Sequence, residues 1–171
     1  GFWAGALYTF IALQTSGCRY LVVGGVAVVL HGHPRFTADL DLVLALDRQN
    51  VEAAIGSLRS LGYQPRAPVV MEELANAAAR RSWAEQKGMT VFSLWSSELP
   101  ATEVDVFVTE PFDFEAAYAR ALRADLGDVI VSVASVADLV AMKRRAGRSV
   151  DLEDVLALEE IEEERRRDGL G

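Results

Sequence analysis

The sequence predicts an α/β (α+β) protein with a small mixed β-sheet flanked by helices and with further helices at the C-terminus. Short apolar, β-branched segments bounded by Gly, Pro or Asp alternate with longer segments whose apolar residues recur at helical spacing. The last two helical segments follow one another with no strand between them. No repeat or long linker divides the 171 residues, so we expect one domain, 1–171, with a core of about 18–133 and a helical unit of about 135–168.

The first part of the chain is punctuated by glycines. Gly17 is placed to end a first helix, the pair Gly24-Gly25 interrupts an apolar run, and Gly62 closes a helix that Asp47 caps. The elements expected up to residue 62 are therefore a helix at 3–15, a strand at 20–23, a short helix at 26–30, a strand at 38–45 and a helix at 48–61.

The second part alternates in the same way before turning helical. Pro111 suits the first position of a helix, because its missing N–H has no partner there in any case. The elements expected after residue 62 are a helix at 71–87, strands at 89–94 and 103–108, a helix at 111–123, a strand at 129–133, and helices at 136–145 and 152–167.

Composition excludes several classes of function. The chain has 17 Lys and Arg against 25 Asp and Glu, a formal charge of −8, which argues against general binding of duplex nucleic acid. Its single cysteine, Cys18, allows no internal disulfide, which favours a cytoplasmic protein. The longest apolar run, 21–30, is too short to cross a bilayer, so we expect no membrane partner and no export signal.

Two aspartates lie inside an apolar strand. Strand periodicity places Asp39 and Asp41 on one face of 38–45 and the leucines between and after them on the other. The strand 103–108 repeats the design, with Glu103 and Asp105 on the face opposite its valines. If these strands are neighbours, three carboxylates, those of Asp39, Asp41 and Asp105, converge on the non-core side of the sheet.

Crowded carboxylates need a proton or a cation. Two like charges about 4 Å apart repel by about 4 kcal/mol at an effective dielectric constant near 20. Ligand sets made only of carboxylates favour Mg²⁺ or Mn²⁺ over zinc, and two such ions can activate a hydroxyl and stabilise a leaving phosphate. The glycine pair Gly24-Gly25, between a strand and a short helix, offers free backbone amides to an anion.

A Gly-Gly pair, a following Asp-x-Asp and a later strand with an aspartate between apolar residues resemble the DNA polymerase-β-like nucleotidyltransferase superfamily. The sequence is most similar to its minimal bacterial branch, which includes the AbiEii-type toxins of abortive-infection and type IV toxin–antitoxin systems. The segments that carry the resemblance are GGVAVVLHGHPRFTADLDLVL, EVDVFV and DLVAMKRRAGRSVDLEDV.

The resemblance implies a nucleotidyltransferase that uses two Mg²⁺ ions, or Mn²⁺, and moves a nucleoside monophosphate from an NTP, ATP among them, to an acceptor hydroxyl. It implies that Asp39, Asp41 and Asp105 are metal ligands and that Asp105 also acts as the base. Lys143 and Asp151 match the Lys and Asp of the toxin branch's C-terminal motif and are implied to be catalytic. An RNA end such as that of a tRNA, a protein or a small molecule is the implied acceptor, and a cognate antitoxin the implied partner.

The resemblance also implies a set of nucleotide-binding residues. Gly24 and Gly25 match the triphosphate loop, and Lys143 would contact phosphate. Arg35 and Thr37 match positions common just before the aspartate pair and are included among the nucleotide-binding residues.

Some features favour plainer interpretations. Val26 follows the glycine pair where the superfamily often has Ser or Thr, so a catalytically silent nucleotide-binding or protein-interaction module is the alternative, and a purely structural partner subunit is a third. His31 and His33 are interpreted as loop residues or contacts to the acceptor rather than metal ligands. Asp151 is as well suited to cap the last helix as to take part in catalysis.

Overall fold

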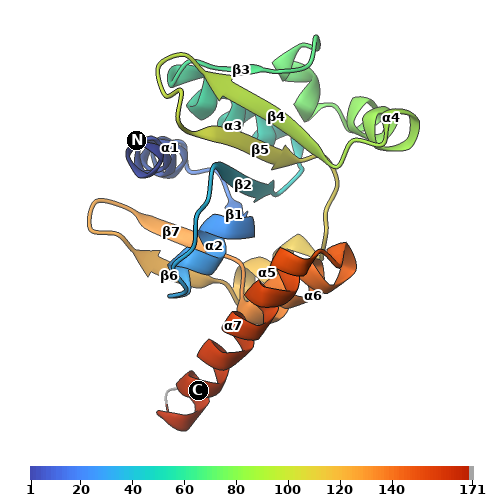
Figure 1. Cartoon of the computed structure of the whole chain (residues 1–171). Helices are drawn as coiled ribbons and strands as arrows, with labels where there is room; N and C mark the ends of the chain where they lie inside the picture. Colours follow the sequence, from blue (N-terminus) through green and yellow to red (C-terminus); the bar gives the residue numbers. More distant parts are fainter. Residues whose placement is uncertain (170–171) are drawn as a thin grey trace.

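A computed structural model describes residues 1–169, except for the side chain of Val150. A mixed seven-stranded sheet of order β3-β4-β5-β2-β1-β7-β6 runs through the molecule (Figure 1). β1 pairs antiparallel with β2 and parallel with β7, and β2 pairs parallel with β5. The strands are β1 (Tyr20–Val23), β2 (Asp39–Leu44), β3 (Tyr63–Pro65), β4 (Val91–Ser96), β5 (Glu103–Phe107), β6 (Leu122–Asp125) and β7 (Ile130–Val133).

Helices cover the sheet unevenly. α1 packs on α3, and α3 lies against the β3 end of the sheet, whereas α6 and α7 pack on each other at the opposite end of the molecule (Figure 1). No helix among the described residues is long and apolar enough to span a bilayer. The helices are α1 (Phe2–Ser16), α2 (Gly24–Leu30), α3 (Arg48–Ser60), the 3₁₀-helix η1 (Met71–Ala75), α4 (Ala77–Lys87), α5 (Phe114–Ala119), α6 (Val136–Ala146) and α7 (Ser149–Arg167).

The core explains why the sheet has one open face. β1 is buried along its whole length, as expected for a short apolar strand in the middle of a sheet. In β5, Val104 and Val106 are buried while the residues on either side of them are partly exposed. Leu40 and Leu42 alternate in the same way with the aspartates of β2. The polar side chains therefore share the face away from α3.

Most predicted elements are confirmed within one to three residues, including the αL end of α1 at Gly17 and the cap of α3, where the Asp47 carboxylate accepts from the backbone N–H of Asn50. The single helix predicted over 71–87 is wrong. Asn76 ends η1 and starts α4, because its side chain accepts from the N–H of Ala79 and caps the second helix.

The helix predicted over 111–123 is also wrong at both ends. Asp113, not Pro111, precedes the first turn, since its carboxylate accepts from the N–H of Ala116. The helix ends at Ala119, and the following residues form β6, which pairs with β7 as a hairpin. This strand and β3 were not predicted.

Candidate active site

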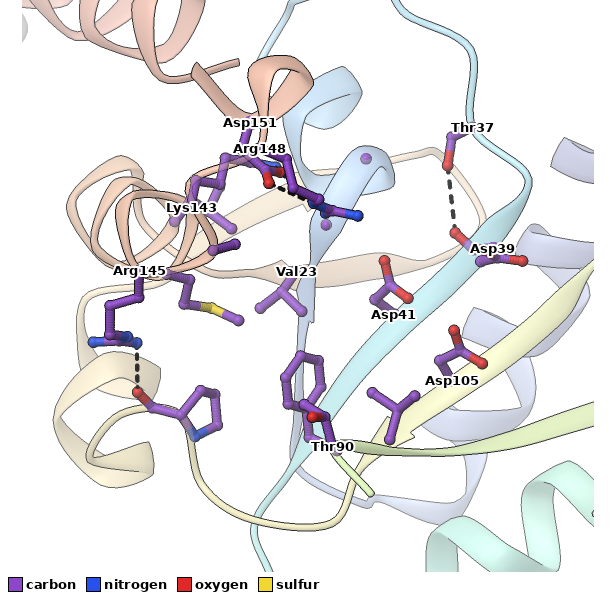
Figure 2. Close-up of a pocket in the computed structure, with 18 of the residues that line it drawn as sticks. Val23, Thr37, Asp39, Asp41, Thr90, Asp105, Lys143, Arg145, Arg148 and Asp151 are labelled. Carbon is purple, nitrogen blue, oxygen red and sulfur yellow. Dashed lines mark hydrogen bonds and ion pairs between the residues drawn. The ribbon is translucent and has the colours of Figure 1, made fainter. Parts of the chain in front are cut away.

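Neighbouring strands bring the predicted carboxylates together. β2 and β5 pair in parallel with Asp41 opposite Asp105 and Asp39 opposite Glu103. Asp39, Asp41 and Asp105 all line one pocket of about 820 Å³ (Figure 2). The strand adjacency that the sequence left open is therefore present, and one sheet face carries all three side chains.

The pKa values of these carboxyls reflect their surroundings. The pKa of Asp41 is raised to about 7, first by burial and then by the charges of Asp105 and Asp39, against the opposing effect of Lys143 and Arg148. Burial also raises the pKa of Asp105, while the Ser93 hydroxyl lowers it as a hydrogen-bond donor. Without a cation, the carboxyl of Asp41 is therefore only partly ionised near neutral pH.

Gly24 is required by its neighbour and by its backbone. Its φ is +70°, and a Cβ added there would lie 1.9 Å from Oδ2 of Asp41. The Asp41 carboxylate thus occupies the space that any other residue at position 24 would need. The glycine pair and the aspartate pair are built as one unit, since β1 ends at Val23 directly opposite Asp41.

The segment before β2 folds back over Gly25. A Cβ at Gly25 would lie 3.0 Å from Oγ1 of Thr37 and 3.4 Å from Cζ of Arg35. The Thr37 hydroxyl donates to the carbonyl of Asp39 at 3.3 Å, and an Arg35 guanidinium nitrogen pairs with Asp154. Both predicted nucleotide-binding side chains therefore lie at the start of α2, as part of the pocket lining.

A cationic wall faces the carboxylates across the pocket. Lys143 is 7% exposed, and its Nζ lies 3.1 Å from Oδ2 of Asp154 and 3.7 Å from Oδ1 of Asp151. Arg148 donates to both oxygens of Asp151, from Nε at 2.6 Å and from Nη2 at 3.1 Å. Figure 2 shows Lys143, Arg145 and Arg148 on one side of Asp41.

Asp151 contacts the cations of this wall and is not at the N-cap position of α7. α7 begins at Ser149 with Arg148 as its N-cap, so Asp151 lies inside the first turn. The side-chain hydrogen bond from Arg148 lowers the pKa of Asp151, which keeps the carboxylate ionised although it is only 2% exposed. Asp151 is thus not the N-cap residue, and its position lining the pocket leaves the site interpretation open.

Three side chains of the wall carried no assigned role in the sequence. Arg148 and Arg145 belong to a basic run that suited a helix end, and Asp154 had no strong signal of its own. Asp154, on α7, is 2% exposed and accepts hydrogen bonds from both Arg35 and Lys143. These two contacts join the segment before β2 to α6. Arg145 donates to the carbonyl of Pro111 at 2.9 Å. The spacing of Asp151 and Asp154, one helical turn apart, was the only available hint.

Two residues near the glycine pair are buried. His31 is buried, with Nε2 2.8 Å from the carbonyl of Ala134 and Nδ1 3.2 Å from Nη2 of Arg165, so it is a neutral structural residue rather than an acceptor contact. Val26 is fully buried in the core and does not line the pocket.

The donor set suits a hard divalent cation in part. Within the described residues, no three His, Cys, Asp or Glu side chains lie close enough together to enclose a metal ion. Mg²⁺, however, is commonly held by one or two carboxylates together with substrate phosphates and water. Such an ion would relieve the repulsion of Asp41 by Asp105 and Asp39, which helps to raise the pKa of Asp41.

A family model described as "Nucleotidyl transferase AbiEii toxin, Type IV TA system" matches residues 5–167. The chain belongs to the AbiEii family. It is therefore a nucleotidyltransferase, and the family resemblance inferred from the sequence is confirmed. No curated protein matches the chain.

Solved structures agree with this AbiEii family fold. The lincosamide antibiotic adenylyltransferase LnuA with lincomycin bound superposes with a TM-score of 0.61 at 16% identity, over 92% of this chain and 96% of that one. ANT(2")-Ia in complex with adenylyl-2"-tobramycin gives 0.59 at 13% identity, over 98% and 99%. At these identities the likeness concerns the fold, and the mixed α/β architecture predicted from the sequence is confirmed.

Proposed function

We propose that this AbiEii family member is a metal-dependent nucleotidyltransferase that moves a nucleoside monophosphate from an NTP to an acceptor hydroxyl and releases pyrophosphate. The observation that carries the proposal is the division of one pocket into a carboxylate side, on β2 and β5, and a cationic side, on α6 and α7. A triphosphate placed between them has cations for its leaving group and carboxylates beside its α-phosphate.

The residues of the pocket divide the work. Asp39, Asp41 and Asp105 would hold two Mg²⁺ ions, or Mn²⁺, which supply Lewis-acid stabilisation of the phosphate charge when bound. Lys143 and Arg148 are held in place by buried carboxylates, so they keep one position as a triphosphate arrives. The pyrophosphate then leaves toward these two cations, which stabilise its charge.

Asp105 would accept the proton of the acceptor hydroxyl. The acceptor oxygen forms a bond to the α-phosphorus, the bond to the β-phosphate oxygen breaks, and the hydroxyl proton passes to the Asp105 carboxylate. Arg35 and Thr37, at the start of α2, line the same pocket and would hold the nucleotide.

We also propose the biological setting that the family implies: a toxin, paired with a cognate antitoxin, with an RNA end such as that of a tRNA, a protein or a small molecule as acceptor. The single, buried Cys18 fits a cytoplasmic protein.

One observation favours a second candidate, a nucleotide-binding or interaction module without turnover. The superfamily often places a hydroxyl after the glycine pair, but Val26 has none. Its side chain is fully buried and offers no other polar group to a phosphate. On this alternative, an NTP would bind between the carboxylates and Lys143 but would not react.

Incubation with α-labelled NTPs, Mg²⁺ and a cell extract separates the candidates. The enzyme predicts label transfer that Asp41→Ala abolishes and Asp128→Ala, on an exposed loop, leaves unchanged. The module predicts thermal stabilisation by NTP without transfer to any acceptor. If NTP gives no label transfer and no thermal stabilisation, both candidates are refuted and a purely structural subunit is favoured.

A further inference from the structure

The carboxylate face of the sheet continues beyond the pocket. β5 pairs antiparallel with β4, and β4 pairs antiparallel with β3. Because side chains alternate between faces and pair across strands, two rows of residues cross this face. One row is Asp41–Asp105–Ser93, and in the row beside it Asp39 pairs with Glu103 and Trp95 pairs with Gln64.

This face is open over β4. α3 lies on the other side of the β3–β4–β5 part of the sheet, and Figure 1 shows no helix of the described residues in front of β4. Trp95 is 38% exposed there and Gln64 is exposed, while Ser93 is half-buried. The surface is therefore continuous with the active site and accessible.

The geometry of the reaction assigns a side to each substrate. In an in-line displacement the attacking oxygen and the leaving oxygen lie on opposite sides of the phosphorus. Lys143 and Arg148, which would hold the leaving pyrophosphate, lie on the α6–α7 side of Asp41 (Figure 2). The acceptor hydroxyl must then arrive from the opposite side, past Asp105 and across β5 and β4.

Trp95 and Arg66 stand on that path. Trp95 is a diagonal neighbour of Asp105 on the adjacent strand, a relation that corresponds to about 7–8 Å between residues. Cζ of Arg66 lies 5.9 Å from the centroid of the Trp95 ring, and Arg66 also pairs with Glu103. Its backbone N–H donates to the carbonyl of Ser93 at 3.0 Å, which fixes it next to β4.

We infer that Trp95 and Arg66 form the acceptor subsite and that its occupant is the 3′-terminal nucleotide of a single-stranded RNA. An aromatic ring stacks on a base of any identity, and a guanidinium beside it binds a phosphate. The terminal base packs on Trp95, the preceding phosphate meets Arg66, and the 3′ hydroxyl reaches Asp105. A contact limited to one chain end suits an acidic protein with a charge of −8, which a large RNA surface does not.

The inference rests on the proposed function, since the direction of attack follows from nucleotidyl transfer. In that step the ribose O3′ forms the new bond to the α-phosphorus, pyrophosphate leaves, and the proton goes to Asp105. Trp95 and Arg66 take no part in bond making. They set the affinity for the acceptor.

Binding of a short 5′-fluorescent single-stranded RNA with a free 3′ hydroxyl, followed by anisotropy with Mg²⁺ and a non-hydrolysable NTP, tests the subsite without requiring turnover. Trp95→Ala should raise the Kd about 5- to 150-fold, as expected for loss of one stacked base, and Trp95→Phe should restore most of the affinity. Trp3→Ala is the matched control, because Trp3 is 45% exposed on α1.

The arginine has an equally close control. Arg66→Ala should weaken RNA binding and flatten its salt dependence, whereas Arg59→Ala should do neither. Both side chains are 55% exposed and both pair with a glutamate, but Arg59 lies on α3. Thermal melting of all four alanine variants checks that each is folded.

Each outcome is decisive. Equal RNA affinity for the Trp95→Ala and Trp3→Ala proteins overturns the subsite, and so does the absence of RNA binding by the wild type. Label transferred in cell extract to protein or to a small molecule but not to RNA overturns the choice of occupant. If no acceptor is labelled, the proposed function fails separately, while the binding comparison still decides whether Trp95 holds RNA.

Discussion

The Asp41 carboxyl makes the stability of the metal-free protein depend on pH in an unusual direction. Its pKa is raised from 3.8 to about 7, first by burial and then by Asp105 and Asp39. A group with a raised pKa in the folded state contributes stability below its unfolded pKa and loses it as pH rises through the folded one. Asp41→Asn removes this loss, so the variant should be more stable than the wild type above pH 7.

The magnitude follows from the shift. A change of about 3 units corresponds to about 4 kcal/mol at about 1.4 kcal/mol per unit. We expect the free energy of unfolding of the Asp41→Asn protein to exceed that of the wild type by about 2–4 kcal/mol at pH 8.5. Near pH 4 the difference should fall close to zero, because Asp41 is then protonated in the folded protein.

Urea unfolding of both proteins in EDTA, at intervals from pH 4 to pH 9, measures this difference. Its rise should centre between the unfolded and folded pKa values of Asp41, about 3.8 and about 7. Added Mg²⁺ should shrink it, since a cation that binds the folded wild type stabilises it selectively. A difference that stays constant with pH, or a variant that is less stable at pH 8.5, would refute the electrostatic reasoning.

Three further predictions address other parts of the site. Gly24→Ala should destabilise the fold by several kcal/mol and abolish NTP-induced stabilisation. The control Gly32→Ala is also at positive φ (+113°) but has nothing within 4 Å of its added Cβ, so it should cost only about 1 kcal/mol. Equal losses in chemical denaturation would contradict the steric argument. Burial lowers the pKa of His31, so wild-type stability should decline as pH falls below about 6.5, and His31→Asn should flatten that decline between pH 5 and 7. Lys143→Met should weaken NTP binding about 10- to 100-fold in titration calorimetry, while Arg144→Met, at an exposed ion pair, should leave it within twofold; a parallel loss in both would argue against a phosphate contact.

The carboxylate half of the site could be predicted because it depends on local periodicity. In β2 and β5 the alternation of Asp or Glu with Leu or Val assigns each side chain to a face, and the pairing of Asp41 with Asp105 required only that the strands be neighbours. The same motifs, in their order along the chain, carried the resemblance to the AbiEii family.

In the cationic half, Lys143 and Asp151 were named from the family resemblance, but the contacts that hold this half together are tertiary and no local pattern encodes them. Asp154 accepts from Arg35, which lies 119 residues earlier in the sequence. β6, with the sequence LRAD, was missed because it is short and its apolar alternation is weak. The break at Asn76 was missed because the side chain of a single asparagine decides between a continuous helix and a cap.

The ion pair between Arg35 and Asp154 has a consequence for how the protein becomes active. The acidic half of the pocket lies on β2 and β5, but the lysine and arginines opposite it come from α6 and α7 and the segment between them. The contact between Arg35 and Asp154 holds α7 to the segment before β2, so both halves face each other only when these helices are docked. Under the proposed function, a molecule that holds α6 or α7 away from the sheet would therefore inactivate the enzyme without touching an aspartate.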